Sequence, residues 1–133
     1  MTTIATPTRT RVSHLFRDGF VALTAASAAT ISVAAAGNAA GISLDVDGAP
    51  IPVLGFGTLT AFFSLVGVVM AVAMARFARR PRSTFVRTTV VLTALSLVPD
   101  VIAPAAPTTK ALLMLTHLVA AAIVIPAVAR KLA

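Results

Sequence analysis

The chain has 133 residues, of which 58% are hydrophobic and only 11% are charged, and its mean hydropathy is +0.97. Because a soluble domain typically carries about 25% charged residues, this composition leaves too little polar surface for a soluble fold, and the absence of Cys excludes disulfides, thiolate nucleophiles and Cys-ligated metal sites. The formal net charge of +7 comes from basic clusters between apolar blocks, with no Tyr or Trp to stack on bases, so we expect contact with the anionic lipids of a bilayer and no nucleic-acid binding.

The N-terminal region combines a basic segment with the first apolar block. Residues 1–14 are Thr-rich and basic and have no apolar period, so we predict a mobile cytoplasmic tail. The apolar block predicts a membrane-spanning helix at about residues 17–38, and its many small residues suit close packing against other helices. A basic leader followed by a short apolar region and Ala34–Ala36 also fits a cleaved signal peptide, and that alternative stays open for residues 1–36.

The segment after the first apolar block contains no Lys or Arg, and its hydrophobic period changes. Apolar and polar residues alternate from Ile42 to Asp47, and Asp47-Gly48 is a turn signal. Pro50 and Pro52 cannot donate to a strand ladder, so any strand here lies at an edge. We therefore predict a short, extracytoplasmic, β-hairpin-like loop over residues 41–57.

Three further apolar blocks predict spans at about residues 57–77, 84–103 and 109–129. The second block ends at the basic run RFARRPR, where a proline breaks any continuing helix, and the third ends in the proline-rich stretch PDVIAPAAP. The expected fold is all-α. It is a single integral membrane domain over residues 1–133, built as a bundle of four transmembrane helices.

Basic residues are distributed unequally between the two ends of the predicted bundle. Translocation of Lys and Arg is disfavoured, so the richer end should be cytoplasmic. We expect a multi-pass protein of the cytoplasmic (inner) membrane with both termini in the cytoplasm, and the strong bias argues against a dual-topology small multidrug transporter. Lys110 lies at the poorer end, and the richer end holds the other ten of the 11 Lys and Arg residues: Arg9, Arg11, Arg17, Arg76, Arg79, Arg80, Arg82, Arg87, Arg130 and Lys131.

Two ionisable residues, Asp100 and His117, lie inside the predicted third and fourth helices. His117 follows Lys110 by seven residues, which places it about 10 Å deep from that end. The short connection makes the two helices antiparallel neighbours, so the two side chains could approach within hydrogen-bond distance. An ionisable group in a span is costly enough that we expect a partner inside the bundle or a polar cavity.

Three interpretations of His117 stay open. A neutral imidazole could bond to Ser96, Thr116, a backbone carbonyl or water and fix the packing of the helices. It could instead form a ligand or proton site with Asp100, since a carboxylate beside an imidazole can hold or relay a proton. The third interpretation is a metal ligand, but one His and scattered Asp residues offer no recognised ligand spacing, and we expect no metal and no cofactor.

Four other polar residues are predicted to bind a ligand in the outer half of the bundle. Asn38, Asp45 and Thr58 have a depth similar to that of the ionisable pair, and Ser96 lies one turn before Asp100. If these side chains converge, they form a polar pocket capped by the loop. If they do not, Asn38 is a helix C-cap and Asp45 is a solvated loop residue.

This pocket suggests three functions. The first is binding of a small hydrophobic or lipid-like molecule or of a partner helix, by a monomer or a homo-oligomer. The second is an enzyme of the isomerase or cyclase type, in which Asp100 and His117 act as a catalytic acid–base pair on a membrane-dissolved substrate. The third is a small transporter subunit, which would require an oligomer because four short helices enclose little pathway.

Three stretches, GISLDVDGAPIPV, LTALSLVPD and LTHLVAAAIVIPAVA, carry a resemblance to a known family. Together with the hydropathy profile, they resemble a family of small four-span membrane proteins of actinobacteria known only as a domain of unknown function. The resemblance covers about residues 15–130. It implies a four-span fold and no particular activity, substrate or cofactor.

Overall fold

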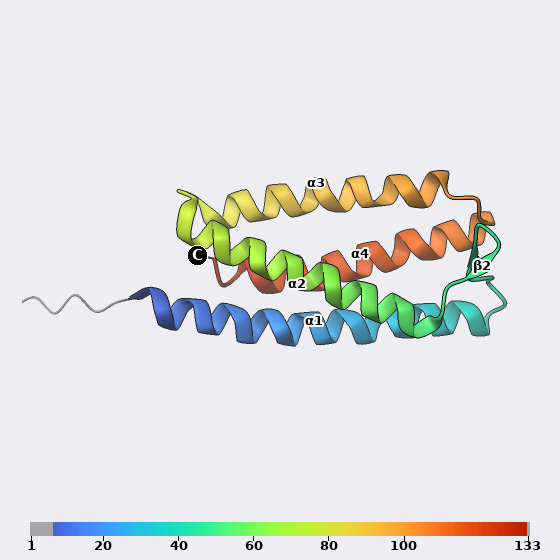
Figure 1. The fold of residues 1–133 in the computed structure, drawn as a ribbon, viewed down its shortest axis with the longest axis horizontal. Helices are drawn as coiled ribbons and strands as arrows, with labels where there is room; N and C mark the ends of the chain where they lie inside the picture. The colour runs from blue at the N-terminus through green and yellow to red at the C-terminus, as the bar shows by residue number, and fades with distance from the viewer. Residues whose placement is uncertain (1–6, 133) are drawn as a thin grey trace, which may run out of the picture.

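The computed structural model describes residues 7–132, and the side chains from Val12 onward. Figure 1 shows four helices that run roughly along one axis, with a small hairpin at one end of the bundle and the end of the chain at the other. Each helix contains a stretch long and apolar enough to cross a membrane, which confirms the predicted all-α bundle of four apolar helices. The elements are α1 (Pro7–Ala39), β1 (Asp45–Val46), β2 (Ala49–Pro50), α2 (Val53–Phe77), α3 (Pro81–Ile102) and α4 (Pro107–Ala129).

All four helices begin earlier than the hydrophobic pattern indicates. In α1, residues 7–14 are helical, although their composition is that of a tail; Pro7 suits the first helical position, and extending a helix costs much less than nucleating one. The other predicted tail residues, 1–6, lie outside the described part of the chain. The remaining helices start at Val53, Pro81 and Pro107 instead of at 57, 84 and 109. Two of these starts again have Pro in the first turn.

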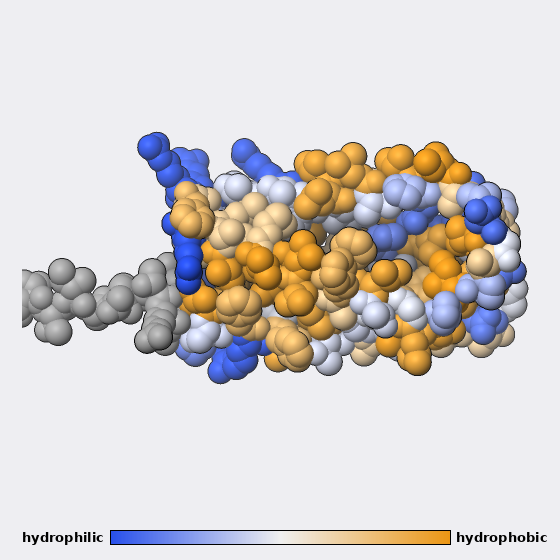
Figure 2. Space-filling model, viewed as in Figure 1, coloured by the Kyte–Doolittle hydropathy of each residue, from blue (hydrophilic) through white to orange (hydrophobic). Residues whose placement is uncertain are grey.

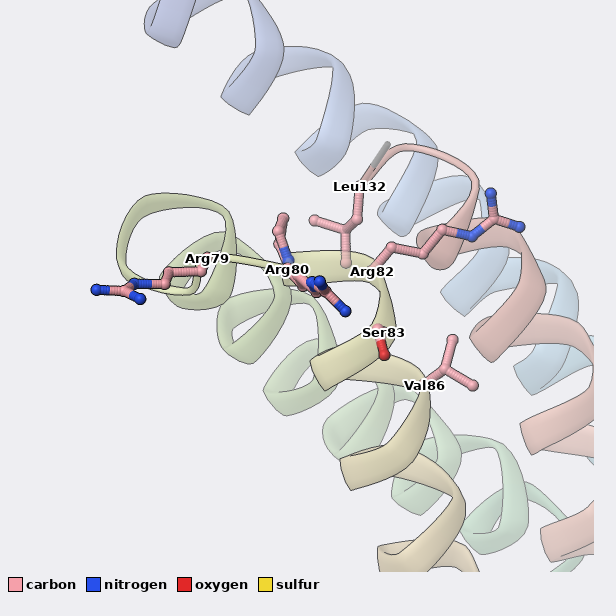
Figure 3. A pocket seen from close by; sticks show the side chains of 7 residues that line it. Arg79, Arg80, Arg82, Ser83, Val86 and Leu132 are labelled. Carbon is pink, nitrogen blue, oxygen red and sulfur yellow. The ribbon is translucent and has the colours of Figure 1, made fainter.

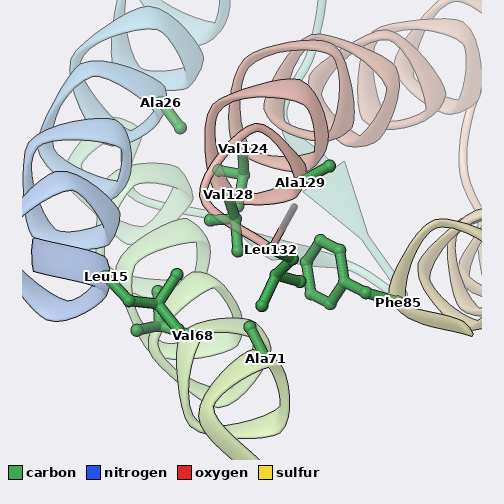
Figure 4. Packing of buried hydrophobic residues seen from close by; sticks show 9 residues of the cluster. All are labelled: Leu15, Ala26, Val68, Ala71, Phe85, Val124, Val128, Ala129 and Leu132. Carbon is green, nitrogen blue, oxygen red and sulfur yellow. The ribbon is translucent and has the colours of Figure 1, made fainter. Parts of the chain in front are cut away.

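The helices do not contribute equally to the bundle. Helix α1 packs along both α2 and α4, whereas α3 packs on α4 and less closely on α2. The main apolar cluster lies toward the end opposite the hairpin and draws on all four helices and the segment after α4 (Figure 4). Its buried members are Leu15, Ala26, Val68, Ala71, Phe85, Val124, Val128, Ala129 and Leu132. A smaller cluster lies under the hairpin and consists of Ala34, Leu44, Phe56 and Leu112.

The outer surface of the helices is apolar, as contact with lipid requires. Figure 2 shows hydrophobic side chains over much of the visible face and hydrophilic ones mainly toward the two ends. Large side chains such as Phe62 and Phe63 are exposed. Because lipid is as apolar as these side chains, helix association depends on close packing and on polar contacts. One such contact joins α1 to α2, where the hydroxyl of the fully buried Thr30 lies 2.9 Å from that of Thr60.

The loop between α1 and α2 contains a minimal antiparallel hairpin with two residues in each strand. Asp47 (φ 53°) and Gly48 (φ 75°) both have the left-handed conformation of a type I′ turn, which confirms the turn signal. Beyond the two paired residues of each strand, the backbone N–H of Ile51 still donates to the carbonyl of Leu44 over 3.0 Å, and α2 begins two residues later at Val53. The strands therefore occupy a smaller part of residues 41–57 than the alternating pattern suggests.

Hydrogen bonds attach this hairpin to the end of the bundle where α3 joins α4. The backbone N–H of Asp47 donates to the carbonyl of Pro104 over 2.9 Å. The hydroxyl of the buried Thr109, in the first turn of α4, donates to the carbonyl of Ser43 over 2.6 Å. The hairpin therefore caps α3 and α4 as well as linking α1 to α2.

Glycine permits the close approach of α1 and α2, and this contact gives a test of the packing. A Cβ atom on Gly19 would lie 2.6 Å from Cγ2 of the buried Val68, whereas a Cβ atom on Gly67 of α2 would meet nothing within 4 Å. We expect Gly19→Ala to lower the free energy of unfolding in detergent by about 1–3 kcal/mol, the usual cost of overpacking. Gly67→Ala is the matched control and should be neutral or slightly stabilising. Equal stability of the two variants would contradict the packing described here.

Candidate functional site

The candidate site begins with a carboxylate buried in the least buried helix. Asp100 lies in the last turn of α3, directly after Pro99, and it is only 7% exposed. The other buried residue of α3 is Phe85, near the opposite end of the helix. An apolar side chain would be the ordinary choice for a buried position in a span, because an ionisable group there is costly. The polar contacts of Asp100 therefore require an explanation.

The partner of Asp100 is His117 on α4. The Nδ1 atom of the imidazole lies 2.8 Å from Oδ2 of Asp100 and 3.0 Å from the carbonyl oxygen of Leu113, one turn earlier in the same helix. The expected approach of Asp100 and His117 is therefore confirmed. So is the antiparallel arrangement of α3 and α4 on which that expectation rested.

One ring N–H cannot serve both acceptors well. Its alignment favours the Leu113 carbonyl, which leaves the buried Oδ2 atom of Asp100 without an aligned hydrogen-bond donor among the described residues. A buried acceptor without a donor costs about 1–3 kcal/mol. The site therefore contains a carboxylate oxygen that shares the one ring N–H near it with a backbone carbonyl.

His117 is more accessible than Asp100. The side chain of His117 is 40% exposed and that of Asp100 only 10%. In a bilayer the exposed part of the ring would meet hydrocarbon at a depth of about 10 Å from Lys110, where no solvent can satisfy it. Figure 2 shows a hollow with hydrophilic side chains below α3 on the hairpin half of the otherwise apolar face. The exposed part of the His117 ring is therefore a polar group on the side of an otherwise apolar bundle.

An apolar groove of about 400 Å³ lies between α3 and α4 and begins one helical turn from the pair. Leu97 precedes Asp100 by three residues and Ala121 follows His117 by four, so each lies on the same helix face as the ionisable residue. Hydropathy alone did not reveal this groove, although small residues at facing positions were a usable signal. Its walls are formed by Val90, Thr93, Ala94, Leu97, Leu118, Ala121, Ala122, Ile125 and Pro126.

The other predicted site residues do not bond to the pair in the described part of the chain. The hydroxyl of Ser96 donates to the carbonyl of Thr93 over 2.6 Å, and that of Thr58 donates to the carbonyl of Leu54 over 3.1 Å. Asn38 is exposed in the last turn of α1. Their ligand-binding role stays a prediction.

Two further residues complete this comparison with the sequence. Asp45 is exposed in the hairpin, where its backbone N–H donates to the hydroxyl of Ser43. Thr116, a possible partner of His117, donates its hydroxyl to the carbonyl of Leu113 over 2.7 Å. Within residues 7–132, no three His, Cys, Asp or Glu side chains come together as a metal site would require.

Comparison with known proteins gives one match. The sequence profile described as "Family of unknown function (DUF6069)" matches residues 10–133, which include nearly all of α1, the hairpin and α2 to α4. No curated protein and no solved structure matches the chain. The candidate site therefore lies within the part of the chain that the family shares.

The contact between Asp100 and His117 can be tested by a double-mutant cycle. With Asp100→Ala, His117→Ala and the double variant, we expect a coupling energy of about 0.6–1.7 kcal/mol in the free energy of unfolding in detergent, the range measured for interhelical hydrogen bonds in membranes. A parallel cycle with the exposed Asp45→Ala in place of Asp100→Ala should show no coupling. If the two cycles give the same value, the pair does not interact.

Proposed function

The chain belongs to the DUF6069 family of unknown function, and we propose that it binds a lipid-like molecule carrying a hydrogen-bonding group. The polar group would lie at Asp100 and His117, and the apolar part would occupy the groove between α3 and α4. The observation that carries this proposal is the buried Oδ2 atom of Asp100, which lacks an aligned donor beside a partly exposed imidazole.

A hydroxyl group suits the polar end of the site. Its O–H can donate a hydrogen bond to a carboxylate oxygen or to the unprotonated Nε2 of a neutral imidazole, and its oxygen can accept one from an imidazole N–H. The Nδ1 edge of His117 is directed at Asp100 and Leu113, so the Nε2 edge is left for a ligand. Binding would supply the donor that Oδ2 lacks and cover the part of the ring that would otherwise meet hydrocarbon.

The groove suits a hydrocarbon chain. Its volume of about 400 Å³ lies within the range of small-molecule sites. From Leu97 to Val90 it extends about 10 Å along α3. The polar residue in its wall, Thr93, donates its hydroxyl to the carbonyl of Thr89 over 2.7 Å and therefore offers little to a polar ligand.

Acid–base catalysis is a second candidate, and the same pair supports it. A carboxylate at one edge of an imidazole, with the other edge accessible, is an arrangement that can transfer protons to and from a substrate. Such a reaction, of the isomerase or cyclase type, also requires a bound lipid-soluble molecule. Binding is the step that both candidates share, and it is the step to test first.

We also propose an inner-membrane location with both termini cytoplasmic and the hairpin on the outer side, in an actinobacterial cell. The charge distribution supports this orientation. The connection between α2 and α3 carries Arg79 and Arg80 at the end where Arg130 and Lys131 also lie, whereas Lys110 is near the hairpin end.

Ligand binding can be tested by native mass spectrometry of protein purified in mild detergent, with a long-chain alcohol added as a defined probe. The wild type should retain the alcohol or an amphiphile from the cell. Asp100→Asn should lower retention about tenfold, since a hydrogen bond to a charged group contributes about 1.5–3 kcal/mol. Ala94→Phe should have a similar effect because it fills the groove.

Matched controls keep this experiment specific. Ala73→Phe changes an exposed alanine of α2, and Asp45→Asn changes an exposed aspartate of the hairpin. Both should retain the probe like the wild type. Equal retention of the alcohol by the wild type and all four variants, with unchanged melting temperatures, would contradict the proposed binding site. The spectra also report whether the chain forms a homo-oligomer.

The orientation can be tested by cysteine labelling, because the natural chain contains no Cys. Ala49→Cys lies in the hairpin, and Ala78→Cys lies between α2 and α3. In cells whose outer layers have been removed but whose cytoplasmic membrane is intact, a membrane-impermeant maleimide should label Ala49→Cys and not Ala78→Cys. Both should react after permeabilisation. Labelling of Ala78→Cys alone would show that the topology is the reverse of the proposed one. Labelling of both variants before permeabilisation would rule out a single orientation.

A further inference from the structure

The end of the bundle opposite the hairpin contains a second cavity, with a volume of about 670 Å³. It lies between the α2–α3 connection, the first turns of α3 and the segment after α4. In Figure 3, Arg80, Ser83 and Val86 lie below Leu132, while the side chains of Arg79 and Arg82 extend to opposite sides. We call it the arginine cavity. Ser83 lies 17 residues before Asp100, or about 25 Å along α3, so the cavity is independent of the site proposed above.

The positive charge of the arginine cavity is not compensated within the described chain. The ion pairs among the described side chains are those of Asp18 with Arg17 and Lys131, and of Asp100 with His117. Asp18 is the carboxylate at this end of the bundle, and it already has two cationic partners. Among the side chains of residues 12–132, Arg80 and Arg82, which line the cavity, therefore have no acidic partner. This charge favours an anionic ligand.

Backbone and hydroxyl donors add to the guanidinium groups. Helix α3 begins at Pro81, and no side chain caps its first turn. The N–H groups of Arg82 and Ser83 have no acceptor within the helix, since the first turn leaves its donors free. Ser83 also contributes a hydroxyl group. Arginine guanidinium groups and free backbone N–H groups both donate hydrogen bonds, and the oxygen atoms of a phosphate group can accept them.

The opposite wall of the cavity is apolar. Leu132 is only 3% exposed, and Val86 is partly buried against the main apolar cluster. The exposed Phe77 ends α2 just before the arginines. The cavity therefore lies at the level where the apolar spans end, which is the level of the lipid headgroups. A ligand that has both a phosphate group and acyl chains fits these two walls better than a free anion does.

We infer that the arginine cavity binds the phosphate group of an anionic phospholipid, with Arg80, Arg82 and Ser83 around the phosphate group and Val86 and Leu132 against the start of its acyl chains. This is a defined lipid site, distinct from the general attraction of basic residues to an anionic membrane surface. The difference is testable because other arginines at the same end lie outside the cavity.

The test is native mass spectrometry of the full chain in detergent with added phosphatidylglycerol or phosphatidylcholine. The wild type should retain phosphatidylglycerol in preference to phosphatidylcholine. The double variant Arg80→Gln/Arg82→Gln should lower retention of phosphatidylglycerol about tenfold or more, since each basic residue near anionic lipid contributes about 1 kcal/mol. Ser83→Leu fills the cavity without changing its charge, and it should also lower retention.

The matched control is Arg76→Gln/Arg87→Gln, which removes two exposed arginines of the same end that do not line the cavity. It should lower retention of phosphatidylglycerol clearly less than Arg80→Gln/Arg82→Gln does, because it removes the same charge and leaves the cavity intact. An equal loss in the two double variants would overturn the inference in favour of general surface charge. Competition by inorganic phosphate as strong as that by phosphatidylglycerol at the same concentration would overturn the lipid assignment. Melting temperatures without lipid confirm that every variant is folded.

Discussion

Hydrocarbon neither donates nor accepts hydrogen bonds, so every polar group inside a bilayer needs a partner within the protein. The four helices meet this requirement for the backbone, and irregular segments occur at their ends. Most hydroxyl groups in the spans bond within their own helix. Thr24 and Ser32, for example, donate to carbonyls one turn earlier in α1. His117 does so through the carbonyl of Leu113, but Asp100 cannot, because a carboxylate has no proton to donate to its own helix. Their contact across α3 and α4 follows from the same constraint.

The number of helices and the turn of the hairpin could be predicted from the sequence because each depends on local physics. Uncharged apolar stretches of sufficient length determine a span, and Asp47-Gly48 tolerates the left-handed conformation that the turn needs. Helix starts were less predictable. Propagation extends α1 back to Pro7, through residues whose polarity suggested a tail.

The sequence predicted how deep the residues of the candidate site lie in the bundle, but not which way their side chains face. Counting residues from Lys110 placed His117 level with Asp100, and the structure brings them within 2.8 Å. Residue counts do not reveal which way a side chain faces. In lipid, the side of a helix that meets protein and the side that meets hydrocarbon are equally apolar, so the hydrophobic pattern does not fix rotation about the helix axis. Ser96 and Thr58 accordingly share the predicted depth, yet each donates to its own helix.

An even number of crossings returns the chain to the face from which it started, and the contact of Lys131 with Asp18 over 2.9 Å holds the last residues of the described chain beside the first span. Reporter fragments attached at Pro7 and Leu132 would start from the same end of the bundle, the one opposite the hairpin. Complementation of a split reporter within a single polypeptide would therefore measure whether the two ends of the described chain share one face of the membrane.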